Sequence, residues 1–497
     1  MSAVVGSMNM PEVRRQLVTE LWIDGSPRAA RTGGQLVVTD PSKDELLATV
    51  SAASEEDVDD AISAARTAQP RWWARRPQGR AAVLFGIADL IRRDAELLAL
   101  VESLDTGKPL SQARTDVEVA AQYFAFYAGI TDKLYGHTIP LDAVDFASTF
   151  REPLGVTGHI VPWNYPLQIS SRTIAPSLAA GNAVVLKPAE EAPLTALLLG
   201  RLVTEAGAPP GLVNVVPGSG QVAGAALAAS DAIDHLSFTG GTVAGRLVMT
   251  ALAKNLKPST MELGGKSPSL VMDDADLDRA VPVITKALIQ NSGQTCSAGS
   301  RVIVARSLHD ELVGRLETSF REVELGAGPA DPDMGPVISR KQHTQVLDAI
   351  ERAESEGAHV ICGGKSADVE GAGGWFVRPT LLTQVTPTME VAQQEVFGPV
   401  LCVLEADSES QAIDLANGTE FGLIAAIWTG SVDRAMRVAR ALTCGQVYIN
   451  SYGAGGGVAL PFGGVGKSGF GREKGVEALM EYSQTKVIVF NSAVADD

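Results

Sequence analysis

Between Gly155 and Thr239, short apolar segments alternate with longer segments of helical periodicity, and no other feature restricts the fold as strongly. Alternation of this kind is typical of a parallel sheet with helices packed on its faces. Ligands of such sheets bind beyond the carboxyl ends of the strands, so the residues after each strand are the first candidates for a binding site. The predicted elements are the strands Val156–Val161, Ala183–Leu186, Val213–Val216 and His235–Thr239 and the helices Arg172–Ala180 and Pro193–Ala206.

The second half of the chain repeats this alternation but does not resemble the first half in sequence. We therefore expect a second α/β domain, and the length of 497 residues fits about three domains in all. The predicted elements are the strands Ser269–Met272, Arg301–Ala305, Val400–Leu404 and Ala425–Trp428 and the helices Leu277–Asn291, Leu308–Glu322, Ser410–Ala416 and Arg434–Ala441.

The segment before the first alternation contains predicted helices and one break. Ser54 precedes three acidic residues and is expected to cap a helix, and Ala81–Leu104 reads as one long amphipathic helix. Leu134–Phe150 loses the helical pattern at Gly136 and Pro140 and predicts a projecting hairpin. A hairpin with little core of its own usually needs a partner, so this one is a candidate subunit contact in a homodimer or homotetramer.

Charge and composition exclude several classes of function. A net charge of −17 disfavours binding to nucleic acid or to an anionic membrane. No apolar run approaches the ~18–20 residues of a membrane helix, and the N-terminus lacks the basic start of a secretory signal. The cysteines are widely separated and the histidines lack ligand spacing, so we expect reduced thiols in the cytoplasm and no metal site. The four cysteines are Cys296, Cys362, Cys402 and Cys444.

Cys296 lies in Asn291–Arg301, a segment of Gly, Ser, Thr and Gln that offers little apolar surface for a core. The segment does offer backbone N–H groups and a close approach for another molecule. A thiol in such surroundings is a candidate nucleophile if its proton is removed. The alternative is a small buried hydrophobic residue, which is what most free cysteines are.

Two further side chains are candidates for chemistry. Glu262 lies between apolar residues and before two glycines, and burial there would raise its pKa toward the range of a general base. The alternative is an ion pair with Lys266. Asn164, held within Pro162–Pro166, carries an amide donor that could stabilise an oxyanion, and the alternative is an Asx turn.

Two strand ends carry groups that suit a dinucleotide. Gly240–Gly245 follows a strand and opens a helix, which directs N–H groups at an anion, although a plain helix start would look the same. Lys187 and Glu190 follow another strand, where a carboxylate can accept from ribose hydroxyls. The alternative for this pair is a surface ion pair.

The chain resembles the NAD(P)-dependent aldehyde dehydrogenase superfamily, in its hydrolytic rather than its coenzyme A-acylating branch. The resemblance runs from about Leu21 to about Lys486, and its motifs occur in family order. They are Pro162–Pro166, Lys187–Glu190, Phe238–Gly241, Glu262–Lys266, Gly293–Ser297, Glu395–Pro399, Pro461–Gly464 and Ser468–Glu473.

The resemblance implies a fold of two doubly wound Rossmann-like domains joined by a small bridging β-hairpin, which serves oligomerisation. It places an NAD(P)-binding domain at 17–132 and 153–262, a catalytic domain at 263–480 and the bridging element at 133–152 and 481–495. The strand Val487–Phe490 would pair with the hairpin.

The resemblance also implies a mechanism. Cys296 attacks the aldehyde as a thiolate, Asn164 and the backbone N–H of Cys296 hold the oxyanion, and hydride loss leaves a thioester. Glu262 then activates the water that hydrolyses it. No metal ligand is implied. The cofactor-binding residues would be Val161, Pro162, Trp163, Lys187, Glu190, Gly220, Gly240, Gly241, Leu263, Glu395 and Phe397.

The resemblance defines the aldehyde substrate and the choice between NAD and NADP less closely than it defines the mechanism. Glu190 favours NAD because it would repel a 2′-phosphate, while Lys187 leaves NADP open. Arg172 resembles an arginine that binds the far carboxylate of a semialdehyde, but the second such arginine is Gln290 here. An aromatic or medium-chain aldehyde is therefore the first expectation, and a dicarboxylic semialdehyde the alternative. The substrate contacts would be Arg172, Tyr165, Thr295, Ser297 and Phe462.

Two other functions compete with aldehyde oxidation. Acylation of coenzyme A from the same thioester usually proceeds without the general base, so Glu262 argues against it. A non-catalytic structural or binding protein on this scaffold would not need Cys296, Glu262 and Asn164 together.

The glycine-rich segment Ser451–Ala459 predicts an open substrate mouth.

Overall fold

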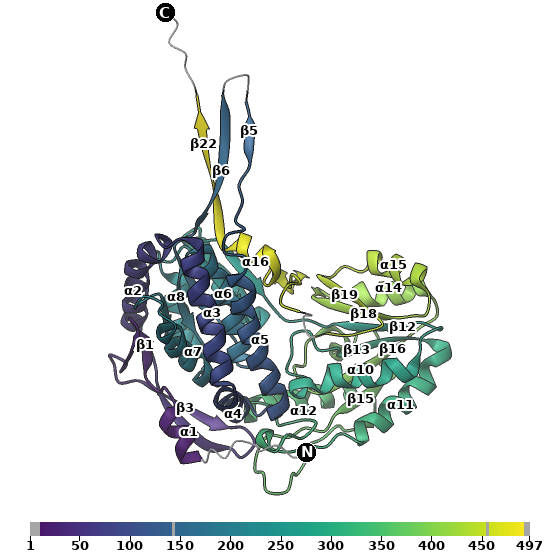
Figure 1. Ribbon diagram of the computed structural model, residues 1–497. Coiled ribbons are helices and arrows are strands. Elements are labelled where there is room, and N and C mark those ends of the chain that lie inside the picture. Colours follow the sequence, from purple (N-terminus) through teal and green to yellow (C-terminus); the bar gives the residue numbers. More distant parts are fainter. Residues whose placement is uncertain (1–9, 142–144, 454–456, 492–497) are drawn as a thin grey trace, which may run out of the picture.

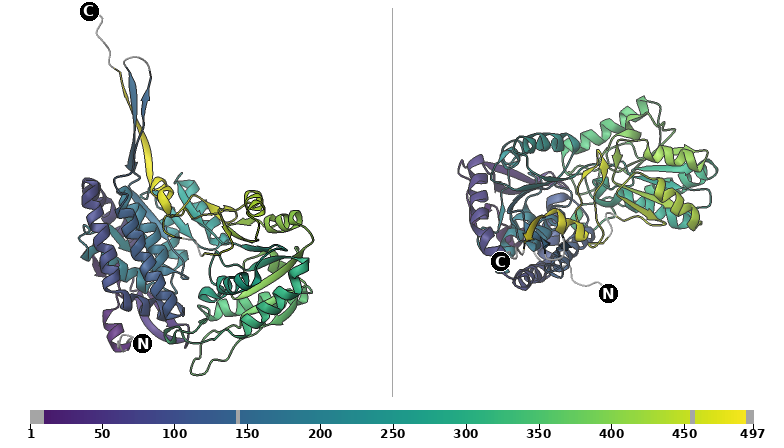
Figure 2. Two further views of the ribbon diagram at one scale, coloured as in Figure 1. Left: turned by 45° about the vertical axis from the view of Figure 1, so that its right-hand side comes forward. Right: turned by 90° about the horizontal axis from the view of Figure 1, so that it is seen from above.

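The structure is a computed structural model that describes residues 10–141, 145–453 and 457–491. Figure 1 shows two α/β lobes side by side, with a narrow group of strands that projects away from both. Figure 2 shows the same projection from a second side. Residues 454–456, part of the glycine-rich segment on which the prediction of an open substrate mouth depends, lie outside the described residues.

The first sheet contains a parallel core with antiparallel edges. Its order is β2-β1-β9-β8-β7-β10-β11-β21, and the five strands from β9 to β11 run parallel. The predicted doubly wound arrangement of this region is therefore confirmed. The bounds are β1 Leu21–Ile23, β2 Ser26–Arg28, β7 Val156–Ile160, β8 Ala183–Lys187, β9 Val213–Val215, β10 His235–Thr239, β11 Ser259–Glu262 and β21 Gly469–Phe470.

The second sheet is built in the same manner from the second half of the chain. Its order is β14-β15-β16-β13-β12-β18-β19, and only β14 runs antiparallel to its neighbour. This confirms the predicted second α/β unit, while the exact domain boundaries stay a prediction. The bounds are β12 Pro268–Val271, β13 Arg301–Ala305, β14 His359–Cys362, β15 Thr380–Thr383, β16 Val400–Ala406, β18 Ile424–Trp428 and β19 Gln446–Ile449.

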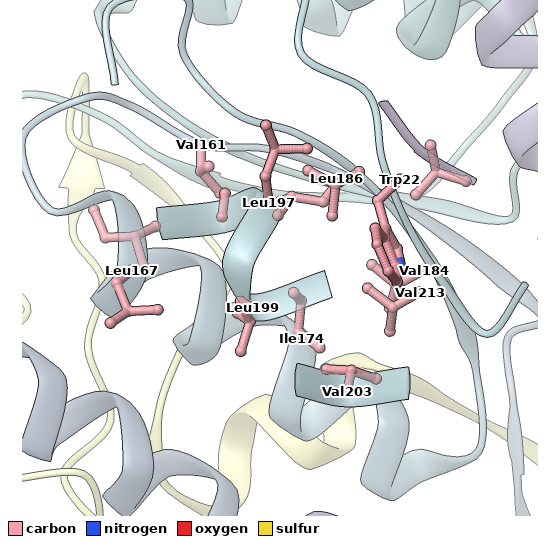
Figure 3. Close-up of a cluster of buried hydrophobic side chains, with 14 of the residues drawn as sticks. Trp22, Val161, Leu167, Ile174, Val184, Leu186, Leu197, Leu199, Val203 and Val213 are labelled. Atoms are coloured by element: carbon pink, nitrogen blue, oxygen red, sulfur yellow. The ribbon is translucent and has the colours of Figure 1, made fainter. Parts of the chain in front are cut away.

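Helices pack against both sheets and bury their apolar faces there. Helices α6 and α7 contact β8 and β9, and Figure 3 shows Ile174 and Val203 from these helices near Val184 and Val213 of the strands. The helices are α1 Met10–Gln16, α2 Glu55–Trp73, α3 Pro77–Arg93, α4 Ala95–Thr106, α5 Leu110–Ala128, α6 Pro166–Ala180, α7 Leu194–Glu205, α8 Ala225–Ala229, α9 Thr242–Lys254, α10 Leu277–Ile289, α11 His309–Arg321, α12 Arg340–Ser355, α13 Glu390–Gln393, α14 Glu409–Asn417, α15 Val432–Ala441 and α16 Gly475–Glu481.

Three helix predictions need correction. The predicted helix at 81–104 is two helices, because Asp94 leaves the helical backbone with ψ 18°. Helix α6 begins at Pro166 rather than at Arg172, since a proline fits the first helical position without losing a hydrogen bond. Helix α10 ends at Ile289 rather than at Asn291, whose φ is +48°. The predicted cap is confirmed: Ser54 Oγ accepts from the Asp57 N–H.

The projecting strands are the predicted hairpin and its C-terminal partner. Strand β22 (Ser483–Phe490) pairs with β6 (Phe146–Pro153), which pairs with β5 (Thr138–Pro140). The rings of Phe146 and Phe490 stack with centroids 4.7 Å apart. Two small sheets complete the fold, β3 (Gln35–Asp40) with β4 (Glu45–Ser51) and β17 (Phe421–Gly422) with β20 (Val465–Gly466). Among the described residues, no helix is both long and apolar enough to cross a bilayer.

Candidate active site

A cavity of about 460 Å³ lies between the two halves of the chain and is lined by residues of both. Every residue that the sequence predicted for the nucleophile, base, oxyanion donor, cofactor and substrate lines it. These residues are Val161, Pro162, Trp163, Asn164, Tyr165, Arg172, Lys187, Glu190, Gly220, Gly240, Gly241, Glu262, Leu263, Thr295, Cys296, Ser297, Glu395, Phe397 and Phe462.

The first sheet positions one wall of this cavity. Asn164 follows β7, Lys187 ends β8, Gly240 follows β10 and Glu262 ends β11, and these four strands are neighbours in the sheet. The carboxyl ends of parallel strands meet at one edge, so four side chains from distant parts of the sequence converge. The expectation that the site lies beyond these strand ends fits this geometry.

Cys296 enters the cavity from the loop that joins the 3₁₀ turn at Gln290–Gly293 to β13. Asn291 and Ser292 both adopt left-handed backbone, with φ of +48° and +57°. Such conformations cost non-glycine residues roughly 1–3 kcal/mol each and persist only where the surroundings impose them. The strain lies a few residues before the cysteine, so the loop is held in one defined path toward the cavity.

The thiol of Cys296 needs help to ionise. Burial raises the pKa of Cys296 to about 12, and the nearby Arg172 guanidinium opposes that rise. Because the thiolate is the nucleophilic form, a group that removes or compensates the proton is required. The cavity supplies candidates for that role, since positive and negative side chains surround the sulfur.

Asn164 is held so that one of its amide donors remains for a ligand. Its Nδ2 donates to the carbonyl oxygen of Gln294 over 2.8 Å. A primary amide carries two N–H donors, so the second is available to the cavity. The adjacent Tyr165 hydroxyl lies 2.8 Å from the Thr295 hydroxyl and joins the same two loops.

Glu262 is a buried carboxyl group with only 2% of its surface exposed. Neither of its oxygens has a hydrogen-bond partner in the described part of the chain, and the Lys266 ammonium has none there either. The alternative of a pair with Lys266 is therefore wrong for this structure. Burial, followed by the charge of Glu473, raises the pKa of Glu262 well above its ordinary value. A carboxylate of this kind can take a proton from water.

The two glycines after Glu262 allow close approach of other groups. A Cβ atom on Gly264 would lie 2.2 Å from the carboxylate of Glu395, and one on Gly265 would lie 2.5 Å from the Cys296 carbonyl oxygen. The Gly265 N–H donates to Glu395 Oε1 over 3.1 Å. Burial raises the pKa of Glu395 to about 7. These glycines thus let the backbone after Glu262 approach Glu395 and the loop of Cys296 closely.

Another part of the cavity wall suits a dinucleotide. Lys187 Nζ lies 3.1 Å from Glu190 Oε2, and although the Glu190 side chain is 40% exposed, Lys187 is buried and both residues line the cavity. Helix α9 begins after Gly241 without a side-chain cap, which leaves its first N–H groups for an anion. The rings of Trp163 and Phe397 meet edge to face at 5.3 Å.

Arg172 is buried in an ion pair with Glu473, which also accepts from the Ser237 hydroxyl over 2.8 Å. The guanidinium lies 5.3 Å from the Phe462 ring centroid, and the Lys474 ammonium lies 5.0 Å from the same centroid. Arg172 therefore forms its ion pair inside the protein and not at the surface.

Several lining residues were not predicted. They include Gln168, Ile169 and Lys474. Tyr452 was not predicted either, and its hydroxyl donates to the Ser297 carbonyl over 2.6 Å. Lys474 directly follows a recognised motif, which was the only available signal for it. No group of side chains among the described residues is arranged to hold a metal ion, and all four cysteines are free thiols.

Comparison with known proteins agrees with the fold. The profile of the aldehyde dehydrogenase family matches residues 28–488, and the chain therefore belongs to the aldehyde dehydrogenase family. The prediction of an NAD(P)-dependent aldehyde dehydrogenase is confirmed at this level. Human retinal dehydrogenase 2 is 41% identical over 477 residues, which are 95% of this chain and 91% of the human protein.

Two solved structures share the fold over nearly the whole chain. The NAD⁺ complex of an aldehyde dehydrogenase from Bacillus cereus matches with a TM-score of 0.95 at 41% identity, covering 97% of this chain and 99% of that one. The betaine aldehyde dehydrogenase of Staphylococcus aureus in complex with NAD⁺ matches with a TM-score of 0.95 at 36% identity, covering 98% and 97%.

Proposed function

We propose that this protein oxidises an aldehyde to its carboxylic acid with NAD as the electron acceptor. The observation that carries the proposal is the convergence in one cavity of a thiol, an amide donor and a buried carboxyl group without a described partner, namely Cys296, Asn164 and Glu262. Each supplies one step of a covalent mechanism in which addition precedes oxidation and hydrolysis.

The residues act in sequence. The Cys296 thiolate forms a bond to the carbonyl carbon, and the free N–H of the Asn164 amide donates to the oxygen that gains negative charge. NAD, when bound, supplies the hydride acceptor that converts this adduct to a thioester. Glu262 removes a proton from water, whose oxygen attacks the thioester and releases the acid and the thiol. The cavity walls around Lys187, Glu190 and α9 would hold the dinucleotide.

A panel of aldehydes tests the proposal directly. We expect NADH to form from at least one neutral aldehyde without coenzyme A, as measured by its absorbance. No NADH from any aldehyde would favour a non-catalytic binding protein, and NADH formed only with coenzyme A would favour the acylating reaction.

For the substrate we propose an aromatic or medium-chain aldehyde. Tyr165, Ile169 and Phe462 give this part of the cavity an apolar surface, and the charge of Arg172 is already compensated by Glu473. In the same panel, benzaldehyde and hexanal should therefore exceed succinic semialdehyde in kcat/KM by about tenfold or more. The reverse order would support the alternative, a dicarboxylic semialdehyde bound through Arg172.

Selection of NAD over NADP depends in this proposal on Glu190. Its carboxylate would accept from the ribose hydroxyls and repel a 2′-phosphate. Because a hydrogen bond to a charged group contributes roughly 1.5–3 kcal/mol, Glu190→Ala should narrow the NAD/NADP ratio of kcat/KM by about tenfold. Glu191→Gln is the control, since Glu191 lines the same cavity without contacting Lys187. An unchanged ratio in Glu190→Ala would assign the selection to other residues.

The NAD⁺ complexes of the two related structures support this choice of cofactor. The exposed apolar side chains of the projecting strands, among them Val487, Val489 and Phe490, support a homodimer or homotetramer, and a mass measurement in solution distinguishes these two states from a monomer. The cytoplasmic location stays a prediction from cysteine usage.

A further inference from the structure

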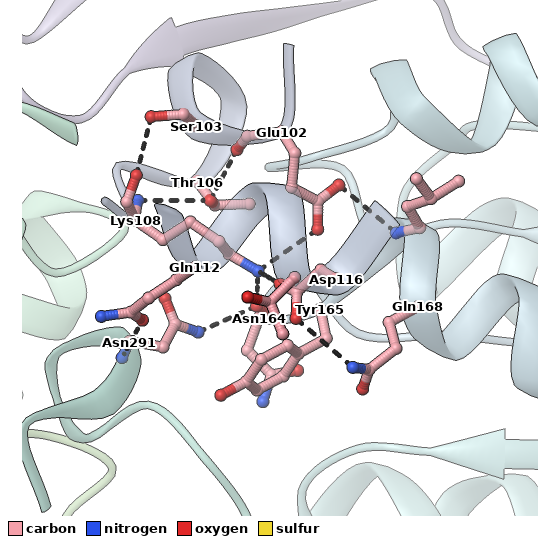
Figure 4. A network of polar contacts seen from close by, with 12 residues as sticks. Glu102, Ser103, Thr106, Lys108, Gln112, Asp116, Asn164, Tyr165, Gln168 and Asn291 are labelled. Atoms are coloured by element: carbon pink, nitrogen blue, oxygen red, sulfur yellow. Dashed lines mark hydrogen bonds and ion pairs between the residues drawn. The ribbon is translucent and has the colours of Figure 1, made fainter. Parts of the chain in front are cut away.

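A cluster of buried charges lies directly behind Asn164. The Lys108 ammonium lies 2.6 Å from Asp116 Oδ2 and 3.2 Å from Glu102 Oε1, and none of these side chains is more than 5% exposed. The same ammonium donates to the main-chain carbonyl oxygen of Asn164 over 3.0 Å. Figure 4 shows Lys108 pointing between the two carboxylates and toward Asn164. Neither Lys108 nor its two acids lines the cavity.

The cluster contacts the segment that follows Asn164 at almost every residue. Lys108 lies 4.3 Å from the Tyr165 ring centroid. The Leu167 N–H donates to Glu102 Oε2 over 3.4 Å, and Gln168 Nε2 donates to Asp116 Oδ1 over 3.3 Å. These contacts extend from the proposed oxyanion donor into the first turn of α6.

Helix α6 depends on this cluster for its N-terminal cap. Tyr165 precedes the helix and provides no side-chain hydrogen bond, so the N–H of Leu167 would otherwise lack an acceptor. Glu102, from the distant helix α4, accepts that N–H and places a negative charge at the positive end of the helix. The path of the chain at Asn164 is therefore fixed from outside its own segment.

A second donor holds the same carbonyl oxygen. Asn291 Nδ2 donates to the Asn164 carbonyl over 2.8 Å, and it also lies 3.4 Å from the Gln294 carbonyl. That Gln294 carbonyl accepts from the Asn164 side chain. Lys108 and Asn291 thus fix the backbone of Asn164, while Gln294 fixes its side chain next to the loop of Cys296.

Stability alone does not explain why an ammonium and two carboxylates are buried here. Removing charges from water is costly, and apolar side chains of similar volume often fill such a site without loss of stability. The Lys108 ammonium instead contacts either the carbonyl oxygen of Asn164 or a carboxylate that itself binds the segment after Asn164.

We propose that Lys108 is a positioning residue for aldehyde oxidation, which acts by fixing the Asn164 amide at the place where the oxyanion develops. This inference rests on the proposed function, in which Asn164 is the oxyanion donor. It assigns a kinetic role to a residue that lines no part of the cavity.

A double-mutant cycle tests the inference. Asn164→Ala should lower kcat by about 10²–10³-fold, as loss of an oxyanion donor does. Lys108→Met should lower kcat by about 10–100-fold, because a displacement of about 1 Å at a catalytic group has effects of that size. In the Asn164→Ala background, however, Lys108→Met should cost less than about threefold, since the group it positions is gone. The KM for NAD should change little in either single variant.

The possible results of this cycle distinguish a wrong role for Lys108 from a wrong role for Asn164 in the proposed function. An Asn164→Ala variant with normal kcat would refute the assignment of Asn164 as the donor. An Asn164→Ala variant with reduced kcat, combined with an equal loss from Lys108→Met in both backgrounds, would leave the donor in place and overturn the role of Lys108.

A second variant keeps the test decisive if Lys108→Met does not fold. Asn291→Gly removes the other donor to the Asn164 carbonyl, and glycine suits the left-handed backbone there, so folding is preserved. It should show the same non-additive loss with Asn164→Ala. Asp105→Asn is the matched control, because Asp105 is a buried acid on α4 that accepts from Leu194 and does not contact the Asn164 segment. Its kcat should equal that of the wild type.

Discussion

Replacing Cys296 by alanine should lower kcat for aldehyde oxidation by about 10⁴-fold or more, because the covalent step then has no nucleophile. The loss should appear in the first turnover as well as in the steady state, since no adduct forms and no hydride is released. Binding of NAD should persist, because the residues proposed to hold it come mainly from strand ends of the first sheet. Stopped-flow NADH absorbance measures the first turnover, and calorimetry measures the binding.

Cys444→Ala is the matched control for this experiment. Cys444 is also a half-buried free thiol, but it lies outside the cavity. Its removal should leave kcat within about twofold, because most substitutions away from a site have small effects. If Cys296→Ala retained a normal first turnover, the covalent mechanism would be wrong even though the surrounding geometry is intact.

Replacing Glu262 by glutamine should separate the two halves of the reaction. The first turnover of NADH should remain within about threefold of the wild type, whereas steady-state turnover should fall by about 10²–10⁴-fold, the usual contribution of a general base. The isosteric amide cannot take the proton from water, so the thioester accumulates. A burst of one NADH per active site, followed by a slow phase, is the expected trace.

The pH dependence of turnover follows from the same residue. Burial and the charge of Glu473 raise the pKa of Glu262, so its proton is held at a pH where an exposed carboxyl group has lost it. Only the ionised form can act as a base, and steady-state kcat of the wild type should therefore rise with pH until Glu262 is deprotonated. That rising limb should vanish in Glu262→Gln.

Asp105→Asn serves as the control for the Glu262 experiment too, because burial also raises the pKa of Asp105 but its side chain lies outside the cavity. It should keep both the burst and the rising limb. Equal losses of burst and steady-state rates in Glu262→Gln would assign that carboxylate to the addition step instead of the hydrolysis step.

Much of the fold could be predicted because local patterns and tertiary structure agree here. Strands β7, β8, β9 and β10 are short apolar segments bounded by turn residues, and the structure places them where the pattern did, whereas β11 was not predicted. The helix boundaries that were wrong, at Asp94, Pro166 and Ile289, depend on backbone angles of single residues. Periodicity averages over a helical turn and does not register such angles.

Much of the lining of the cavity could be predicted from motifs, because the turns that follow the strands also contain the polar residues that face the cavity. The cluster of buried charges behind Asn164 could not be predicted from the sequence. Lys108, Glu102 and Asp116 lie on or beside α4 and α5, and nothing in their spacing indicates that they face inward together. Whether a charge is buried depends on how α4, α5 and α6 pack together, and no single segment of the sequence determines that packing.

Intact-protein mass spectrometry of Glu262→Gln during turnover tests most directly whether the substrate becomes a thioester of Cys296. With hexanal and NAD, we expect a mass increase equal to one hexanoyl group, located on the peptide that contains Cys296 and absent from Cys296→Ala. An unmodified protein mass while NADH is being formed, or an acyl group on any other residue, would contradict the account.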